Sequence, residues 1–292
     1  MLIPQTKKAL LKQKQQFDFF YKNPRQGHGR IDPFNPVKYR ILDMPEDGTI
    51  GNSDMQSIWN LRGRANQALH WDGMNPNLRE VVLSSAIGDG ATEKSIVLRD
   101  LTRLEAWISD LPAPKYPLPI NKALVDRGSR IFLTNCASCH GAGSPRIGRV
   151  IPLSEIQTDG HRSAMWRQNS ADSYNNYIKR ASWKFENFRS TEGYVAVPLD
   201  GIWARAPYLH NGSVPSLYDL LQDVENRPDV FWRGNDVYDF EKVGFTSAVP
   251  KIEQAGFLYV TTEKGNANTG HTYGTHLPEE DKTALLEYLK TL

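Results

Sequence analysis

Apolar side chains recur at helical spacing over residues 276–292. The apolar stripe consists of Leu285, Tyr288, Leu289 and Leu292. Pro278 and the three acids that follow it suit a first helical turn. Proline lacks the amide hydrogen that is unpaired there, and acids interact favourably with the positive end of the helix dipole. The pattern therefore predicts a helix over this segment.

Two earlier segments carry stripes of the same kind. Over residues 122–135 the stripe is Leu124, Gly128, Ile131 and Phe132, and over residues 97–111 it is Leu101, Leu104, Trp107, Ile108 and Leu111. Both patterns predict amphipathic helices. We expect the helix at 122–135 to cross the one at 276–292, with Gly128 and Phe132 against Leu285 and Tyr288. Two amphipathic helices that pack elsewhere would show the same pattern.

A proline-dense stretch, residues 112–119, predicts an extended linker between two domains. The chain as a whole has 18 prolines and 22 glycines, which favours long irregular connections around few helices. Strand formers at residues 257–262 predict a short β-hairpin around residues 255–275. The predicted fold class is mainly α, with long irregular loops.

The charge of the chain favours no nucleic-acid or strongly acidic partner. The formal net charge is +2 over 292 residues, which is long enough for two modest domains. The first segment is basic, and we interpret it as a solvated terminus. No apolar run approaches the length of a transmembrane segment, and residues 1–8 lack the pattern of a secretory signal.

Residues 136–140 read Cys-Ala-Ser-Cys-His, and Cys136 and Cys139 are the only cysteines in the chain. C-x-x-C-H is the attachment signature of c-type haem. Two thiols at this spacing can bond to the two vinyl groups of one haem, and the imidazole of His140 then becomes the proximal ligand of the iron. The motif predicts one covalent haem c.

Other uses of the cysteine pair fit less well. A disulfide would need only the two thiols and would not require the histidine that directly follows them. A thioredoxin-like pair would lie between a strand and a helix, whereas this one follows a helical segment. A structural zinc site needs four ligands, and no second cysteine pair is present. Because haem is coupled to thiols outside the cytoplasmic membrane, the motif indicates a periplasmic or extracellular bacterial protein, in a mature or truncated form.

Short stretches on the two sides of the linker resemble each other. Ile58-Trp59 and Leu69-His70-Trp71-Asp72-Gly73 precede the helix ending at Leu111, and Ile202-Trp203 and Leu209-His210-Asn211-Gly212 precede the helix ending at Leu292. The similarity predicts a basic segment 1–36, a partial domain 37–111, the linker 112–119 and a haem domain 120–292. The partial domain has no cysteine and cannot attach haem covalently.

The stretch Val197-Pro-Leu-Asp-Gly-Ile-Trp-Ala-Arg-Ala-Pro-Tyr-Leu-His-Asn-Gly-Ser-Val-Pro-Ser-Leu-Tyr-Asp-Leu-Leu221 resembles the bacterial di-haem cytochrome c peroxidase superfamily. Within it, the chain is most similar to rubber-oxygenase-like di-haem c-type cytochromes. The agreeing segments also include residues 29–35, 69–73, 233–239 and 270–275. The resemblance runs from about residue 27 onward and breaks where the first haem motif is expected. It implies a cytochrome c-like helical domain behind a partial, haem-less cytochrome c-like domain.

In this superfamily one haem binds peroxide or oxygen, and the other stores or relays an electron. The motif at 136–140 matches the second haem, which is six-coordinate in the oxygenase-like branch. The resemblance therefore implies an oxidoreductase lineage of which this chain retains mainly the electron-transfer half. Relatives of the peroxidase branch bind calcium, but no compact acidic loop in this sequence requires one.

The second axial ligand decides the chemistry of the iron. Methionine would raise the reduction potential, a second histidine would lower it, and an open site would permit oxygen or peroxide chemistry. Met165 is the only methionine after the motif, and its polar surroundings predict an exposed side chain. His271, in the Gly- and Asn-rich loop 265–274, is the predicted distal ligand. The resemblance places a ligand at the same Gly-His-x-Tyr-Gly motif. His276 is the alternative ligand, or else caps the last helix.

Four further residues are candidates for haem-pocket contacts. Arg146, Arg149 and Arg205 can each pair with a propionate, because a guanidinium makes two parallel bonds to a carboxylate. Solvated surface positions explain the arginines equally well. His210 lies in a tight turn, where it either holds the loop or contacts a propionate.

Three functions follow from these patterns. The first is a bis-His electron-transfer cytochrome with one haem and a redox partner protein. The second is a haem peroxidase or an oxygenase cleaving an unsaturated polymer, which needs an open iron or a second haem-bearing chain. In the third, the partial domain docks a separate haem-bearing chain or a neighbouring subunit, because a missing domain half should expose apolar surface.

Overall fold

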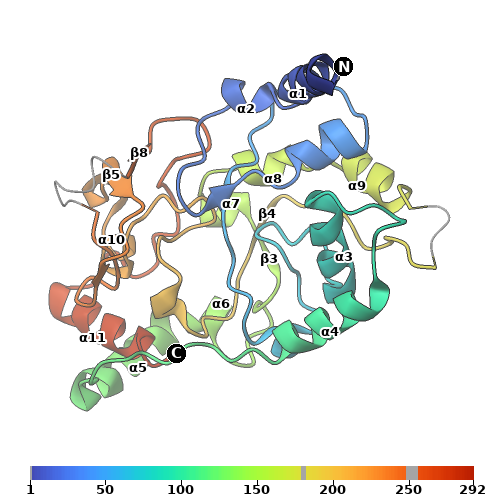
Figure 1. The fold of residues 1–292 in the computed structure, drawn as a ribbon. Helices are drawn as coiled ribbons and strands as arrows, with labels where there is room; N and C mark the ends of the chain where they lie inside the picture. Colours follow the sequence, from blue (N-terminus) through green and yellow to red (C-terminus); the bar gives the residue numbers. More distant parts are fainter. Residues whose placement is uncertain (1, 179–181, 248–255) are drawn as a thin grey trace.

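The computed structural model describes residues 2–178, 182–247 and 256–292 (Figure 1). The helices are α1 (Leu2–Gln16), α2 (Phe19–Lys22), α3 (Leu78–Gly88), α4 (Leu98–Ser109), α5 (Lys122–Asn135), α6 (Ala137–His140), α7 (Leu153–Ile156), α8 (His161–Met165), α9 (Gln168–Asn175), α10 (Leu217–Leu220) and α11 (Glu279–Leu289). A π-helical turn, η1, spans Val37–Ile41, and 3-10 turns are η2 (Leu61–Arg64), η3 (Ile202–Ala204) and η4 (Val224–Asn226).

The described strands form two-stranded antiparallel ladders. They pair β1 (Arg30–Ile31) with β2 (Ser53–Asp54), β3 (Val150–Pro152) with β4 (Gly193–Val195), β5 (Val230–Arg233) with β8 (Phe257–Val260), and β6 (Tyr238–Asp239) with β7 (Gly244–Phe245). No helix in the described ranges is long and apolar enough to cross a membrane.

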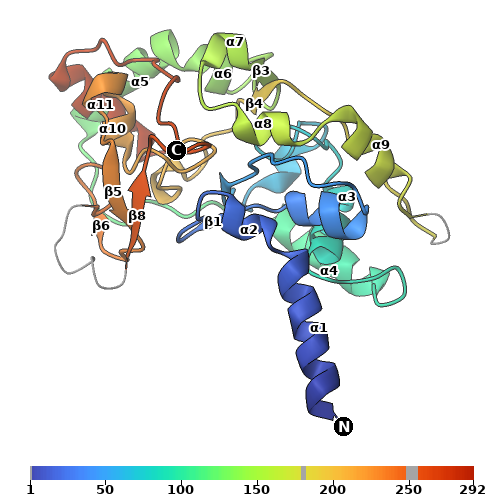
Figure 2. The same cartoon turned by 90° about the horizontal axis from the view of Figure 1, so that it is seen from above.

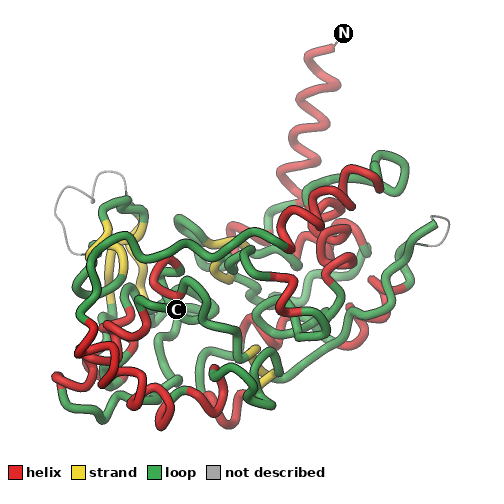
Figure 3. Tube along the Cα trace, turned by 90° about the horizontal axis from the view of Figure 1, so that it is seen from below, coloured by secondary structure: helices red, strands yellow, loops and turns green. Residues whose placement is uncertain are grey.

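The prediction of a mainly α fold was wrong. Helices account for 37% of the chain and strands for 10%, and loops make up most of the rest (Figure 3). The cause is the shortness of the elements between α5 and α11, which apart from the eight-residue helix α9 are single helical turns or ladders of two to four residues. Frequent glycine and proline interrupt the hydrophobic periodicity there, so packing depends on irregular connections.

The predicted hairpin around residues 255–275 was also wrong. Residue 255 lies outside the described residues, and the strand formers at 257–260 do make a strand, β8. Its partner is β5, with Phe231 opposite Tyr259. A strand pattern gives the local conformation and does not identify the partner strand.

Helices α5 and α11 pack side by side, as predicted (Figure 1). The side chain of Asn121 caps α5 by accepting hydrogen bonds from the first amides of the helix. A Cβ placed on Gly128 would overlap the carbonyl oxygen of Ala284, so glycine is what permits this close contact. The ring centres of Phe132 and Tyr288 lie 5.1 Å apart. This crossing fixes the position of the segment that follows α5.

The described residues form two hydrophobic cores. The first contains Phe34, Met74, Leu83, Ile87, Met165, Trp166 and Tyr174. It therefore combines residues from both sides of the stretch 112–119. The second joins α5, α10 and α11 through Phe132, Leu217, Leu285 and Leu289. Figure 2 shows that α1 projects away from both cores.

Met165 is not the exposed side chain that its polar neighbours suggested. It is 0% exposed and belongs to the first core. Its carbonyl oxygen accepts a hydrogen bond from the buried ammonium group of Lys38, 3.1 Å away. The polar residues around Met165 in sequence form buried ion pairs and hydrogen bonds, so their polarity does not indicate exposure.

Candidate haem site

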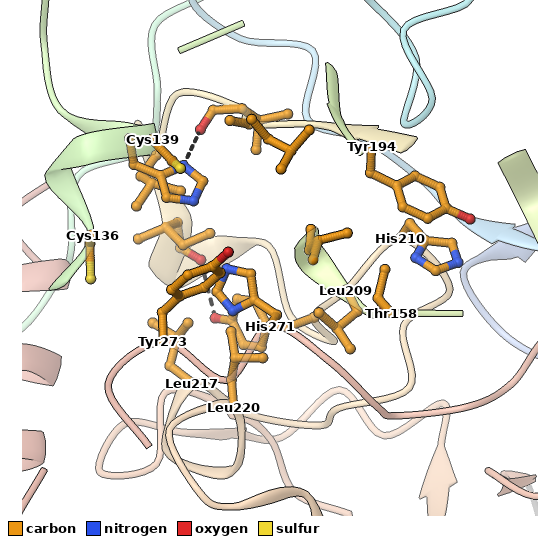
Figure 4. Close-up of a pocket in the computed structure, with 18 of the residues that line it drawn as sticks. Cys136, Cys139, Thr158, Tyr194, Leu209, His210, Leu217, Leu220, His271 and Tyr273 are labelled. Carbon is orange, nitrogen blue, oxygen red and sulfur yellow. Dashed lines mark hydrogen bonds between the residues drawn. The ribbon is translucent and has the colours of Figure 1, made fainter. Parts of the chain in front are cut away.

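Cys136, Cys139, His140 and His271 line one cavity of about 180 Å³ (Figure 4). Its remaining wall is mostly aliphatic, with Leu199, Ile202, Leu217, Leu220, Leu221, Leu285 and Leu289. Cavities that bind cofactors are typically apolar with a few converging polar groups. The four residues of the predicted attachment and ligation are therefore brought together by the fold.

The two thiols come from the junction of two helices. Cys136 follows the last residue of α5, and Cys139 lies in the single turn of α6. Both thiols are free and half-buried. Burial and the neighbouring Cys139 raise the pKa of the Cys136 thiol to about 11. Cys136 is therefore a neutral thiol at physiological pH, unlike the low-pKa thiolates of redox-active pairs.

The ring of His140 is oriented by the backbone of a distant loop. Its Nδ1 lies 2.8 Å from the carbonyl oxygen of Val197, which leaves Nε2 as the atom free to bind a metal. Burial is the main cause that lowers the pKa of His140, and nearby Arg205 acts in the same direction. The imidazole is therefore neutral, as metal ligation requires.

His271 lies across the cavity in a loop with a constrained backbone. Its φ is +47°, and its amide donates to the carbonyl oxygen of Ile156 over 2.9 Å. Burial, with a smaller contribution from His140, lowers the pKa of His271 to about 3. Its Nδ1 is buried and has no hydrogen-bond partner among the described residues. The ring is therefore neutral and carries an unpaired nitrogen.

Arg227 fixes this loop, and sequence analysis missed it. Its guanidinium donates to the carbonyl oxygens of Asn268, Gly270 and His271 at 2.6, 2.8 and 3.2 Å. Burial lowers the pKa of Arg227 to about 10, so it remains charged at neutral pH. Arg227 lies 41 positions before Asn268 in the sequence, so no local pattern connects it with the loop.

The separation of the two imidazoles suits a shared metal between them. The ring centres of His140 and His271 lie 6.3 Å apart, with their planes at 50°. A metal–imidazole bond of about 2 Å and a ring radius of roughly 1 Å place the centres of two opposed imidazoles about 6 Å apart. The residues present therefore fit a bis-His haem iron with two thiols beside it.

Two of the four candidate pocket residues line the cavity. His210 is buried, and its ring stacks on Tyr194 with 3.9 Å between centres. Arg205 donates to the carbonyl oxygens of Pro198 and Asp200, and burial lowers its pKa to about 10. Arg205 therefore adds positive charge at the wall of the cavity. Because backbone carbonyls hold its terminal nitrogens, it has limited freedom to reach a propionate.

The other candidates lie elsewhere. Arg146 forms an exposed ion pair with Glu155, and Arg149 lines a separate cavity. His276 is exposed and is not among the described residues that line the haem-type cavity. No group of three or more His, Cys, Asp or Glu in the described ranges is arranged to hold a metal ion, so the structure adds no support for calcium.

Comparison with known proteins finds similarity to a cytochrome c-like family over part of the chain. Residues 193–233 match the family model described as "RoxA-like, cytochrome c-like". These residues include the sequence stretch that resembles the rubber-oxygenase-like cytochromes, and they supply Arg205 and His210. The match supports that lineage, with haem c and electron transport as its general properties.

Two relatives come from Sinorhizobium fredii. "Uncharacterized protein y4iM" is 30% identical over 260 residues, which are 78% of this chain and 58% of that protein. "Uncharacterized protein y4iJ" is 44% identical over 108 residues, which are 34% of this chain and 18% of that protein. The chain thus spans little more than half the length of the first relative.

Proposed function

We propose that this chain is a c-type cytochrome with one covalent haem, and that it transfers single electrons through an iron ligated by His140 and His271. The observation that carries the proposal is the 6.3 Å separation of these two neutral imidazoles across a cavity that also holds both cysteines. The haem would supply one-electron redox chemistry. Because haem is coupled to thiols outside the cytoplasmic membrane, a periplasmic or extracellular location is part of this proposal.

Side chains and backbone groups of the chain hold the proposed ligands in position. Cys136 and Cys139 would anchor the porphyrin ring through their sulfurs. Val197 orients the ring of His140, and Arg227 fixes the loop that carries His271. Ligands held in this way move little when the charge of the site changes, which favours rapid electron exchange with a redox partner protein.

The aliphatic wall limits access of water and of other small ligands. Leu217, Leu221 and Leu285 are buried and belong to the same core as Phe132. An apolar surrounding with two imidazole ligands leaves no coordination position for peroxide or oxygen. Electron transfer therefore accounts for this site better than peroxidase or oxygenase chemistry at the same iron.

The absorption spectrum of the periplasmically matured protein tests the proposal. We expect a pyridine haemochrome assay to give one haem c per chain, and a low-spin oxidised spectrum that does not change when peroxide is added. A high-spin charge-transfer band that responds to peroxide would overturn bis-His ligation in favour of an enzyme. A colourless protein would remove the haem assignment altogether.

A further inference from the structure

A separate cavity of about 460 Å³ adjoins the haem-type site. Its aromatic lining residues are Trp59, Phe231, Trp232 and Phe245, and we name it the aromatic-walled cavity. Neither the two thiols nor the two proposed iron ligands are among its described lining residues. Met55, which also lines it, is 67% exposed, so the cavity can be reached from solvent. Its volume lies in the range of cavities that bind small molecules.

Only a thin wall separates this cavity from the haem-type cavity. Arg205 and Pro207 line both of them. Two hydrogen bonds cross the same wall at Asp54, a lining residue of the aromatic-walled cavity. Its amide donates to the carbonyl oxygen of His210 at 2.8 Å, and its carbonyl oxygen accepts from the indole nitrogen of Trp71 at 2.7 Å. His210 and Trp71 line the haem-type cavity, and electron tunnelling is fastest through short, bonded connections of this kind.

The charges around the aromatic-walled cavity balance. Its described lining residues include two arginines, Arg205 and Arg233, and two aspartates, Asp54 and Asp236. The guanidinium of Arg233 pairs with Asp54 at 3.3 Å, and both side chains are buried. Backbone carbonyls hold the terminal nitrogens of Arg205. Because the buried charges already have partners, the cavity favours an uncharged ligand.

Two side chains of the cavity can donate hydrogen bonds to such a ligand. The Nε2 of Gln56 is buried and has no hydrogen-bond partner among the described residues. His28 presents an exposed imidazole. Its ring lies against Gly234, where φ is +103° and an added Cβ would be 2.5 Å from the ring, so glycine is what permits this position. A ligand with two carbonyl oxygens would satisfy both donors.

We infer that the aromatic-walled cavity binds an uncharged quinone, which exchanges electrons with the haem-type site through the shared wall. Aromatic side chains favour a planar aromatic ligand. The balanced charges exclude a strongly anionic or cationic one, and Gln56 and His28 match its two carbonyl oxygens. The electron exchange rests on the proposed function, whereas the binding of the quinone does not.

Reduction of the bound quinone to a hydroquinone consumes two electrons and two protons. The electrons are those that the proposed function delivers one at a time, and they come from the redox partner protein. His28 delivers the protons to the quinone oxygens, since an imidazole both donates and regains a proton near neutral pH. Its exposure lets it recover each proton from solvent.

Titration calorimetry with 2-methyl-1,4-naphthoquinone tests the binding on the intact protein. We expect saturable one-to-one binding. Ser57→Trp places a large side chain in the cavity and should weaken binding at least tenfold. Ser173→Trp, at an exposed position of α9, is the matched control and should bind normally. For the unaltered protein, 1,4-naphthoquinone-2-sulfonate should bind at least tenfold more weakly, because its negative charge finds no free cation.

Anaerobic stopped-flow mixing of the reduced protein with the same quinone tests the electron exchange. His28→Gln should bind the quinone within threefold of the wild-type dissociation constant and slow reoxidation at least tenfold, because proton delivery is lost. Ser57→Trp should slow reoxidation by a similar factor. If Ser57→Trp were reoxidised at the wild-type rate, the quinone would be reduced elsewhere on the surface, and the inference would be overturned.

Calorimetry needs no haem signal, so this inference and the proposed function fail separately. A low-spin, coloured protein that shows no saturable binding would overturn the quinone site and leave the proposed function intact. Equal loss of binding in Ser173→Trp, or equal affinity for the sulfonate, would also overturn the site. A colourless protein that still binds the quinone in the manner described would retain the site and remove only the electron exchange.

Discussion

The guanidinium of Arg227 donates a hydrogen bond to the backbone carbonyl of His271, 3.2 Å away, and two more to the residues just before it. The backbone that carries the His271 ring is thus held by a buried guanidinium. A glycine-rich loop is normally mobile. This contact explains how such a loop can present an imidazole at one fixed distance from another.

Replacing Arg227 with Gln should loosen the distal ligand without removing it. We expect a mixture of low-spin and high-spin haem. Free imidazole added at micromolar to millimolar concentration should bind the vacant iron and restore a fully low-spin spectrum. Absorption spectroscopy during an imidazole titration measures this. The exposed Arg130→Gln variant is the control and should remain low-spin. A variant at Arg227 that is folded and entirely low-spin would show that the loop holds its shape without the guanidinium.

Substitution of His271 distinguishes the two candidate distal ligands. His271→Ala should convert the oxidised haem to high spin and allow it to bind cyanide or peroxide. His271→Met should restore six-coordination and raise the midpoint potential on the order of 0.1 V or more, within the range of about 0.8 V that axial ligands span. His276→Ala should leave spectrum and potential unchanged, because His276 is exposed. A high-spin His276→Ala protein would reverse this assignment.

The contact between α5 and α11 predicts a large difference between two glycines. A Cβ at Gly128 would overlap the backbone of Ala284, whereas one at Gly88 meets nothing within 4 Å. Gly128→Ala should destabilise the protein by about 3 kcal/mol, the upper end of the usual cost of overpacking, because a backbone atom must move. Gly88→Ala should be neutral or slightly stabilising. Chemical denaturation of both variants measures the difference. Equal stabilities would mean that α5 and α11 can move apart to accommodate the added methyl group without loss of stability.

The sequence predicted the parts of the site that depend on local pattern. The helix over residues 122–135, its crossing with the last helix, and the positions of Cys136, Cys139 and His140 depend on periodicity and a five-residue motif. The structure agrees with the first two and gathers the motif residues with His271. Local patterns of this kind need no knowledge of distant contacts.

Features that depend on distant contacts were not predictable. The strand β8 pairs with β5, and Met165 is buried by residues far away in the chain. The sequence similarity aligned His70 with His210, but the residues that share a left-handed φ just after an isolated β-bridge are His70 and Leu209, at 62° and 64°. The two loops therefore share a backbone conformation at a position where their side chains differ. Sequence similarity alone therefore gave the wrong register.

A buried cation in the first core provides a prediction on acid stability. The Nζ of Lys38, whose side chain is 1% exposed, donates to Asp47 at 2.7 Å and to Thr49 at 2.9 Å. Burial lowers the pKa of Lys38. Burial alone would raise the pKa of Asp47, but hydrogen bonds from Lys38, Tyr39 and Thr49 outweigh it and hold that pKa well below its usual range.

A carboxyl whose pKa is lower in the folded state stabilises the protein above its unfolded pKa, and this stabilisation is lost as the pH falls below it. The unfolded pKa of Asp47 is about 4. Asp47→Asn should therefore cost about 3 kcal/mol at neutral pH, because Lys38 loses its counter-charge. It should also reduce the loss of stability on acidification below about pH 4.

Urea denaturation at a series of pH values measures both effects. Glu46→Gln is the control, since Glu46 forms a half-exposed ion pair with Arg40 and should cost less than about 1 kcal/mol. If Asp47→Asn lost stability on acidification as steeply as the wild type, the acid sensitivity would have to come from another carboxyl. The buried pair of Asp72 and Arg162 would then be the next to examine, since both side chains are 2% exposed.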